Sequence, residues 1–226
     1  MKLAILFSGG KDSTYTVYKA LKEKHEIKYL ITVIPKNKDS YMFHTACLNL
    51  PKIQAKLIGI EYLEIEVSGQ KEKEVEELKQ FLEKIKNEID AIGAGAIKSK
   101  YQRERIEKIA KELNLKTFFP LLNKNCYEHW KEILNLGFKV IITKISTYGI
   151  PEKFLGKVID NEALEELKVL SEKYGFDLCF EGGEAETLVL DSPIFSKEIV
   201  LKNFEIKKES NSFWIEIKEI ELKDKK

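Results

Sequence analysis

The chain has 226 residues, of which 43% are hydrophobic and 33% are charged, and its 38 basic and 37 acidic residues leave a formal net charge of +1. This composition is typical of a globular protein that buries one large core or two modest ones. The balanced charge excludes a global attraction to nucleic acid, although a local basic patch stays open. No apolar run approaches the roughly 18 residues of a membrane span, and the N-terminal segment lacks a signal-peptide pattern. We therefore expect a cytoplasmic protein with no membrane partner.

Strands and helices are predicted to alternate through the first half of the chain. Apolar, β-branched runs predict strands, and apolar residues spaced three or four apart predict the helices between them. Since parallel strands need crossover connections, we expect an α/β fold with a doubly wound, five-stranded parallel sheet. The strands are expected at 1–7, 29–34, 62–67 and 117–119, and residues 91–97 are expected to be a strand that runs into a turn of small residues. The helices are expected to bury Val17, Ala20 and Leu21; Leu57; Val75, Leu78, Leu82, Ile85 and Ile89; and Ile106, Ile109, Ala110 and Leu113.

The second half has a different pattern, in which antiparallel strands close the chain. A phase shift in the alternation after Ile217 predicts a β-bulge there. No linker rich in Gly, Pro or Ser separates the halves, so we expect two packed domains, 1–122 and 123–226, the second of α+β type. Its expected elements are a helix around Trp130 that ends at Gly137, a strand at 140–142, a helix over 164–170, and strands over 199–206 and 213–222.

Residues 8–13, with the sequence SGGKDS, connect the first expected strand to the first expected helix. Two glycines allow a tight turn whose backbone N–H groups converge on an anion. Lys11 adds a positive charge, Ser8 and Ser13 add hydroxyl donors, and the helix directs its positive dipole end to the same place. The pattern predicts a phosphate cradle, although it differs from the G-x-x-x-x-G-K-[ST] loop. The alternative is an ordinary strand-to-helix turn with a capping serine.

Residues 95–105 form a second unusual segment, in which small residues precede a cluster of donors at a helix start. Tyr101 and Arg105 are four residues apart and should share a helix face. The guanidinium of Arg103 or Arg105 is suited to a bidentate contact with a carboxylate or phosphate. The alternative is a solvated helix start with Ser99 as its cap.

Three carboxylates, those of Glu181, Glu184 and Glu186, surround a glycine pair between two apolar segments. Crowded carboxylates repel one another unless a cation lies among them. The segment therefore favours a Mg²⁺ site or a pocket for a cationic group. A hairpin loop with solvated acidic side chains is the alternative.

The three cysteines, Cys47, Cys126 and Cys179, lie far apart and form no C-x-x-C motif. A disulfide framework, a zinc site and an iron–sulfur site are therefore not expected. We expect buried free thiols.

The SGGKDS segment resembles the signature of the PP-loop ATP pyrophosphatases, which split ATP between the α and β phosphates and adenylate a substrate. Further motifs make nearly the whole chain similar to the diphthine–ammonia ligase family. These motifs are SYMFHT (40–45), GAIKSKYQRERIE (95–107), ITKISTYGI (142–150), FLGKVID (154–160) and EGGEAETLVLDSPIF (181–195). The resemblance implies a HUP-like, adenine nucleotide alpha hydrolase-like first domain. It also implies ATP, Mg²⁺, ammonium and translation elongation factor 2, which carries the modified histidine.

The resemblance further implies the site residues. Residues expected to bind ATP are Ser8, Gly9, Gly10, Lys11, Asp12, Ser13, Thr32, Val33, Gly95, Ala96 and Ile97. Residues expected to bind the acceptor are Tyr101, Gln102, Arg103, Glu181, Gly182, Gly183, Glu184, Glu186 and Thr187. Lys11, Asp12 and Glu186 are the expected catalytic residues, with Asp12 also the expected Mg²⁺ ligand. Phe180 stands where the family pattern suggests Gly, and Ala185 and Leu122 stand where it suggests aromatic residues.

The expected reaction is ATP-dependent amidation of diphthine to diphthamide with release of AMP and pyrophosphate. Two rivals are a PP-loop enzyme that modifies tRNA and a nucleotide-sensing protein without turnover. The near-zero net charge and the absence of C-x-x-C disfavour the first. The dense polar motif at Glu181 disfavours the second. The sequence leaves the oligomeric state open, including that of a homo-oligomer.

Overall fold

The computed structural model describes residues 1–36, 50–70 and 72–225. The chain divides into two compact units. The first unit consists of Met1–Ser8 and Asp12–Leu122, and the second consists of Gly9–Lys11 and Asn123–Lys226. Three residues of the predicted phosphate loop are thus grouped with the C-terminal half of the chain. The SYMFHT motif at 40–45 lies outside the described residues.

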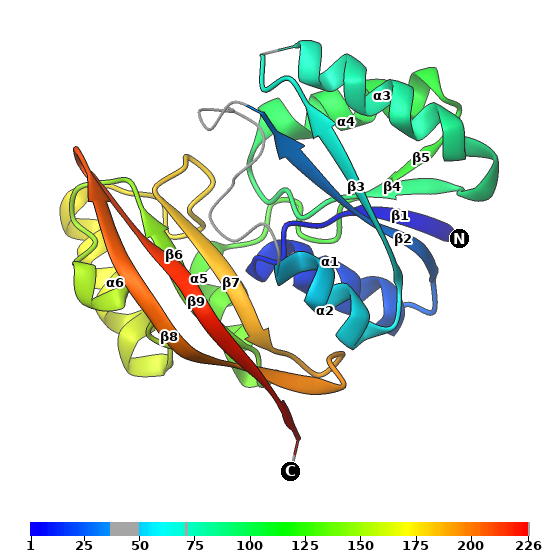
Figure 1. Cartoon of the computed structure of the whole chain (residues 1–226). Helices are drawn as coiled ribbons and strands as arrows, with labels where there is room; N and C mark the ends of the chain where they lie inside the picture. Colours follow the sequence, from blue (N-terminus) through cyan, green and yellow to red (C-terminus); the bar gives the residue numbers. More distant parts are fainter. Residues whose placement is uncertain (37–49, 71, 226) are drawn as a thin grey trace. The chain divides into compact units, whose positions relative to one another are not determined.

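A parallel sheet forms the centre of the first unit (Figure 1). Its strands are β1 (Lys2–Leu6), β2 (Glu26–Pro35), β3 (Glu61–Val67), β4 (Ala91–Gly93) and β5 (Lys116–Phe118). They are ordered β3-β2-β1-β4-β5, and every neighbouring pair is parallel. The predicted doubly wound, five-stranded sheet is therefore confirmed. The segment 91–97 is, as predicted, a strand that runs into a turn of small residues, since residues 94–97 follow β4 as a loop.

Helices cover both faces of this sheet, with α1 and α2 on one side and α3 and α4 on the other (Figure 1). Their bounds are α1 (Lys11–Lys22), α2 (Leu50–Ile58), α3 (Lys73–Ile85) and α4 (Lys100–Glu112), and a 3-10 turn, η1 (Lys86–Glu88), follows α3. The predicted apolar stripe of α3 packs against the sheet, but Ile89 reaches the same core from beyond η1. Leu21 was wrongly predicted as a core residue, since it is 39% exposed near the end of α1. Ser99 caps α4 by accepting the Gln102 N–H at 3.3 Å.

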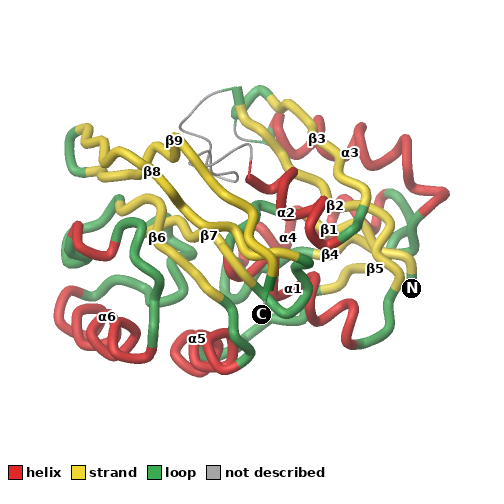
Figure 2. Tube along the Cα trace, turned by 60° about the horizontal axis from the view of Figure 1, so that its bottom comes forward, coloured by secondary structure: helices red, strands yellow, loops and turns green. Residues whose placement is uncertain are grey.

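The second unit is an antiparallel sheet with two helices on one face (Figure 2). The sheet is ordered β7-β6-β9-β8. Asn125 caps the N-terminus of α5, and Gly137 follows that helix with a left-handed φ of 83°, as predicted. The predicted α+β type is confirmed. The elements are α5 (Cys126–Asn135), β6 (Lys139–Ile145), η2 (Glu152–Phe154), α6 (Asn161–Tyr174), β7 (Ala185–Asp191), β8 (Lys197–Glu209) and β9 (Ser212–Asp224).

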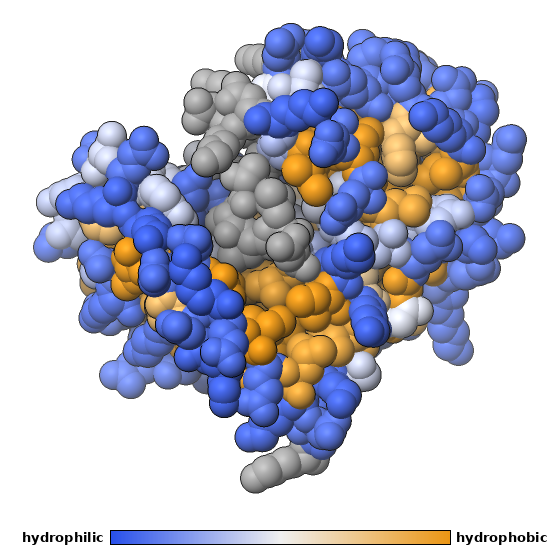
Figure 3. Space-filling view, viewed as in Figure 1, coloured by the Kyte–Doolittle hydropathy of each residue, from blue (hydrophilic) through white to orange (hydrophobic). Residues whose placement is uncertain are grey.

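The long hairpin of β8 and β9 carries the predicted irregularity. The register of the two strands shifts between the pair Leu201–Ile220 and the pair Phe204–Ile217. The irregularity therefore lies at the predicted position, after Ile217. Lys and Glu side chains cover its exposed surface, much of which is blue in Figure 3. Such charges discourage pairing of the edge strand β8 with another chain. Within the described part of the chain, no helix has the length and apolar character needed to cross a membrane.

Gly95 brings the loop after β4 into direct contact with the start of α1. A Cβ atom at this position would lie 2.8 Å from the Asp12 carbonyl carbon and 2.9 Å from both the Asp12 oxygen and the Ser13 nitrogen. Real Cβ atoms do not approach backbone this closely. The sequence therefore needs glycine here because two backbone segments pack without a side chain between them.

We predict that Gly95→Ala lowers the free energy of unfolding by about 2 kcal/mol, because helix backbone has to move to admit the methyl group. Gly93→Ala is the comparison variant, since its Cβ would lie 2.9 Å from a side-chain atom, Ile5 Cγ1, and would displace a side chain but no helix backbone. Urea denaturation of both variants beside the wild type tests the difference. Equal midpoints for the two variants would contradict the close packing at Gly95.

Candidate functional site

The glycine loop begins where β1 ends and closes on the first turn of α1. The Ser8 N–H donates to Ser13 Oγ at 3.2 Å, and the two serine hydroxyls are also 3.2 Å apart. Gly9 has a φ of 76°, in the left-handed region that glycine enters without strain. This places the loop at a helix N-terminus, where N–H groups and the helix dipole favour an anion.

The carboxyl ends of neighbouring strands assemble the remaining predicted nucleotide segment in the first unit. Thr32, on β2, donates its hydroxyl to the Phe7 carbonyl oxygen at 2.6 Å and is 5% exposed. Val33 is also buried. On the other side of β1, the loop after β4 packs Gly95 onto the start of α1, and Ala96 and Ile97 are buried beside it in sequence. The structure therefore brings together the predicted segments at Ser8, at Thr32 and at residues 95–97.

Lys11 has a buried ammonium group, which the sequence did not indicate. The residue is 1% exposed, and its Nζ donates to the carbonyl oxygen of Cys179 at 2.9 Å. Nζ also lies 5.4 Å from the ring centroid of Trp130 and 5.7 Å from that of Phe180. Both distances are in the range of cation–π attraction, which strengthens away from water. The phosphate role of Lys11 stays a prediction, since the structure records a protein acceptor for its ammonium.

Two residues of the glycine loop, Gly9 and Lys11, also make hydrogen bonds to β7 within the second unit. The Lys11 N–H donates to Thr187 Oγ1 at 3.2 Å, and the Val189 N–H donates to the Gly9 carbonyl oxygen at 3.0 Å. Thr187 and Val189 belong to β7. The predicted acceptor residue Thr187 therefore contacts the predicted phosphate loop directly.

Glu184 organises the turn that precedes β7. Its Oε1 accepts the Asp177 N–H at 3.2 Å, and its Oε2 accepts the Gly182 N–H at 2.9 Å. Gly183 has a φ of 84°, which requires glycine for an unstrained turn. A Cβ atom at Gly182 would lie 2.7 Å from Glu184 Oε1, so the carboxylate fills the space beside the turn. Glu184 acts as a scaffold for the backbone of this segment.

Glu186 has a different partner. Its Oε1 lies 3.3 Å from Lys144 Nζ, and its side chain is only 11% exposed. Lys144 and Glu186 are directly paired in the register of β6 and β7. Backbone amides and a lysine therefore compensate the charges of Glu184 and Glu186 within the protein, and a Mg²⁺ ion or a cationic group among the three acids stays a prediction. Glu181 is partly buried in the same segment.

Phe180 adopts the backbone conformation that explains why glycine is expected there. Its φ is 64°, and a non-glycine residue in this region costs roughly 1 kcal/mol. Its ring packs 6.1 Å from the Trp130 ring and 6.4 Å from the Phe176 ring. Ring burial beside the Lys11 ammonium offsets the backbone strain.

The donor cluster on α4 is largely engaged by protein groups. Arg105 stacks its guanidinium carbon 3.3 Å from the Tyr101 ring centroid and donates through Nε to Glu72 at 3.1 Å. Arg103 Nε lies 3.5 Å from the Glu107 carboxylate. Burial raises the pKa of the Tyr101 phenol, while the Arg105 guanidinium acts in the opposite direction. Tyr101 and Arg105 share a helix face as predicted, and Gln102 and Arg103 are partly buried beside them.

Cys126 and Cys179 form a disulfide, so the prediction of free thiols was wrong for these two residues. They are separated by 53 positions, and their Cα atoms lie 5.1 Å apart. Such spacing carries no signal, because only the folding of the 177–184 turn against α5 brings the two sulfurs together. Asp177 Oδ1 accepts the Cys179 N–H at 3.0 Å and lies 3.3 Å from Cys126 Sγ.

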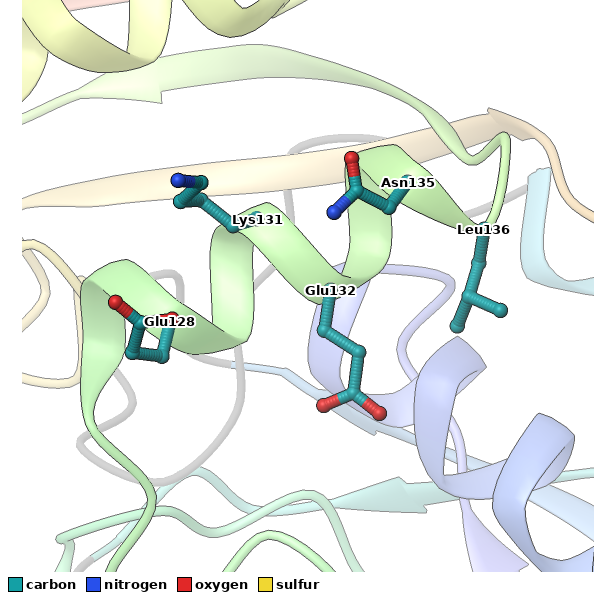
Figure 4. Close-up of a pocket in the computed structure, with 5 residues that line it drawn as sticks. All are labelled: Glu128, Lys131, Glu132, Asn135 and Leu136. Carbon is teal, nitrogen blue, oxygen red and sulfur yellow. The ribbon is translucent and has the colours of Figure 1, made fainter.

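One surface pocket lies along α5 (Figure 4). All of the residues that line it come from α5 or directly follow it, and they bear both charges. Its lining consists of Glu128, Lys131, Glu132, Asn135 and Leu136. The pocket shares no residue with the predicted nucleotide or acceptor sites.

Comparisons with known proteins agree with the resemblance. The chain matches the model of the diphthamide synthase N-terminal domain over residues 1–117 and that of the diphthamide synthase C-terminal domain over residues 125–223. It is 34% identical to the diphthine–ammonia ligase of Rattus norvegicus over 226 residues, which covers 91% of this chain and 84% of the rat protein. It is 33% identical to that of Homo sapiens over 227 residues, covering 91% and 85% of the two chains.

Structural likeness adds less. A solved structure described as a predicted subunit of tRNA methyltransferase from Methanocaldococcus jannaschii aligns with a TM-score of 0.47 and 19% identity, over 85% of this chain and 98% of that chain. A likeness at this level carries no information about function. The two family models span both halves of the chain, and the relatives align along most of it. The chain therefore belongs to the diphthamide synthase family.

Proposed function

We propose that this protein is a diphthine–ammonia ligase, which uses ATP to convert the carboxylate of diphthine on translation elongation factor 2 into the amide of diphthamide. The observation that carries the proposal is the loop that Ser8 and Ser13 close at the N-terminus of α1, with Gly95 packed against the same turn. This loop offers backbone donors and a helix dipole to a phosphate group. Membership of the diphthamide synthase family supports diphthine as the acceptor.

Two displacements make up the proposed reaction. The diphthine carboxylate attacks the α-phosphorus of ATP, and pyrophosphate leaves with the electron pair of the broken P–O bond. Ammonia, formed by loss of a proton from ammonium, then attacks the acyl carbon, and AMP leaves. The protein contributes positioning and charge stabilisation, without a covalent enzyme intermediate.

The residues have separate proposed roles. The loop at 8–13 receives the departing pyrophosphate, with Lys11 as its cation and Asp12 beside it. Thr32, Val33 and residues 95–97 line the nucleotide. The acceptor-binding set comprises Tyr101, Gln102, Arg103, Glu181, Gly182, Gly183, Glu184, Glu186 and Thr187. Within that set, Glu184 acts by shaping the turn, since both of its carboxylate oxygens accept backbone N–H groups.

We also propose Mg²⁺ as the ion that accompanies ATP. Across the described residues, the only group of potential metal-ligating atoms that lie close together is Cys126, Asp177 and Cys179, which is no hard oxygen site. Mg²⁺ commonly binds through one or two carboxylates together with substrate phosphates. A single carboxylate, that of Asp12, is therefore sufficient for the proposed site. When bound, the ion would neutralise phosphate charge.

The first expected outcome concerns the products. Turnover should convert ATP to AMP and pyrophosphate, because the loop is proposed to hold a departing pyrophosphate. Chromatography of the spent nucleotide, with diphthine-bearing elongation factor 2 and ammonium present, measures this. ADP as the main product would contradict the proposal.

Glu186 provides a second test. Glu186→Gln keeps the size of the side chain but removes its charge, and we expect kcat/KM for the acceptor to fall about tenfold or more. The matched control is Glu198→Gln, which breaks the ion pair of the same sheet between Lys139 and Glu198, 2.7 Å apart. The control should keep full activity. If Glu186→Gln lowers the melting temperature sharply but retains its specific activity, its pair with Lys144 is only structural.

The nitrogen source is the third test. A ligase that takes nitrogen from glutamine needs a nucleophilic thiol to form a thioester. Cys126 and Cys179 are joined as a disulfide, which leaves Cys47 as the remaining cysteine of the chain. Because the relatives are named diphthine–ammonia ligases, we expect amide formation with an ammonium salt and none with ammonium-free glutamine. Equal rates with both donors would refute this, and Cys47→Ser would then identify the thiol.

A further inference from the structure

We infer that the Cys126–Cys179 disulfide positions the Lys11 ammonium, and thereby the glycine loop, for binding of ATP. The expected effect on ATP binding rests on the proposed function. The placement of the Lys11 ammonium by the disulfide is a property of the second unit and does not depend on that function. The loop lysine and the disulfide lie far apart in sequence, and the cysteine spacing does not predict the disulfide.

The first link is between Lys11 and Cys179. An ammonium group buried to 1% exposure requires a nearby acceptor, since burial without one costs several kcal/mol. The Cys179 carbonyl oxygen, 2.9 Å from Nζ, is such an acceptor. The rings of Trp130 and Phe180 flank the same nitrogen. A displacement of the Cys179 backbone therefore displaces the ammonium or removes its acceptor.

The second link is between Cys179 and α5. The disulfide attaches Cys179 to Cys126, the first residue of α5, whose N-terminus Asn125 caps by accepting two backbone N–H groups. One turn along the helix, Trp130 donates its Nε1–H to the Leu178 carbonyl oxygen at 2.9 Å. The adjacent residues Leu178 and Cys179 are thus both attached to α5, one by a hydrogen bond and the other by the disulfide.

The third link is Asp177, whose carboxylate lies near both cysteines and would have different contacts in the disulfide and dithiol forms. Its Oδ1 accepts the Cys179 N–H at 3.0 Å and lies 3.3 Å from Cys126 Sγ. A dithiol reagent would break the S–S bond by supplying two electrons and two protons, while its own disulfide forms. The Cys126 thiol is then placed to donate to Asp177, so the reduced chain keeps a hydrogen bond there but loses the covalent tie to Cys179.

The thiol count tests whether the bond exists. In a Cys47→Ser background, the oxidised protein should take up no N-ethylmaleimide under denaturing conditions, and the protein treated with dithiothreitol should take up two. Intact mass measures both. Two adducts without reductant would overturn the inference, as would stoichiometric Zn²⁺ binding by the protein as isolated, since the same atoms would then form a thiolate site.

Binding of ATP tests the positioning. We expect reduction of the disulfide to weaken ATP binding about tenfold in protein that retains Lys11. In Lys11→Ala we expect reduction to weaken ATP binding by less than about twofold, because this variant has no ammonium group for the disulfide to position. Isothermal titration calorimetry at four conditions, oxidised and reduced in each background, gives the coupling. The double variant Cys126→Ala, Cys179→Ala repeats the comparison without reductant, and far-UV circular dichroism checks that each form is folded. An equal loss in both backgrounds would show a merely structural disulfide.

A spectroscopic readout separates this inference from the proposed function. Trp130 and Trp214 are the two tryptophans of the chain, so Trp214→Phe isolates the Trp130 emission. Reduction should shift this emission in protein that retains Lys11, and the shift should be smaller in Lys11→Ala. Identical shifts in the two backgrounds would overturn the positioning. If no form binds ATP but the shifts differ, the proposed function fails while the positioning stands.

Discussion

A buried ammonium group constrains the second unit more than any other feature. The Lys11 side chain lies out of water, where an ammonium group needs a carbonyl acceptor and electron-rich surfaces close by. The Cys179 carbonyl oxygen, the Trp130 ring and the Phe180 ring meet that need. These groups come from a short turn and from α5, so the conformation of the turn and the position of the loop lysine depend on each other.

One carboxylate of the EGGEAE segment (181–186), that of Glu184, stabilises this same turn. Glu184 accepts two backbone N–H groups, and Glu186 pairs with Lys144 across two strands. Two of the three acids that crowd this segment in the sequence thus have different partners, one in a backbone scaffold and one in a cross-strand ion pair. The two glycines between the acids admit the sharp backbone turn, and one of them leaves space for the Glu184 carboxylate itself.

The first unit is organised by a simpler rule. Parallel strands present their carboxyl ends at one edge of the sheet, so loops that are distant in sequence gather there. The loop after β1, Thr32 on β2 and the loop after β4 meet in this way. At Gly95 the approach is so close that backbone touches backbone. The conformation for which we propose anion binding thus depends on a packing contact as well as on the glycines of the loop.

The sequence by itself determined the sheet, its helices and the place of the glycine loop, because these follow from local patterns: apolar runs, helical spacing and a glycine turn before a helix. The hairpin bulge was also readable, since a shift in alternation records it. Tertiary structure alone decided the disulfide, the burial of Lys11 and the partners of the acids. Cys126 and Cys179 are 53 positions apart, and no periodicity connects Lys11 with Cys179. Such contacts depend on how a turn packs against a helix, and a pairing between distant residues leaves no trace in the local pattern of either.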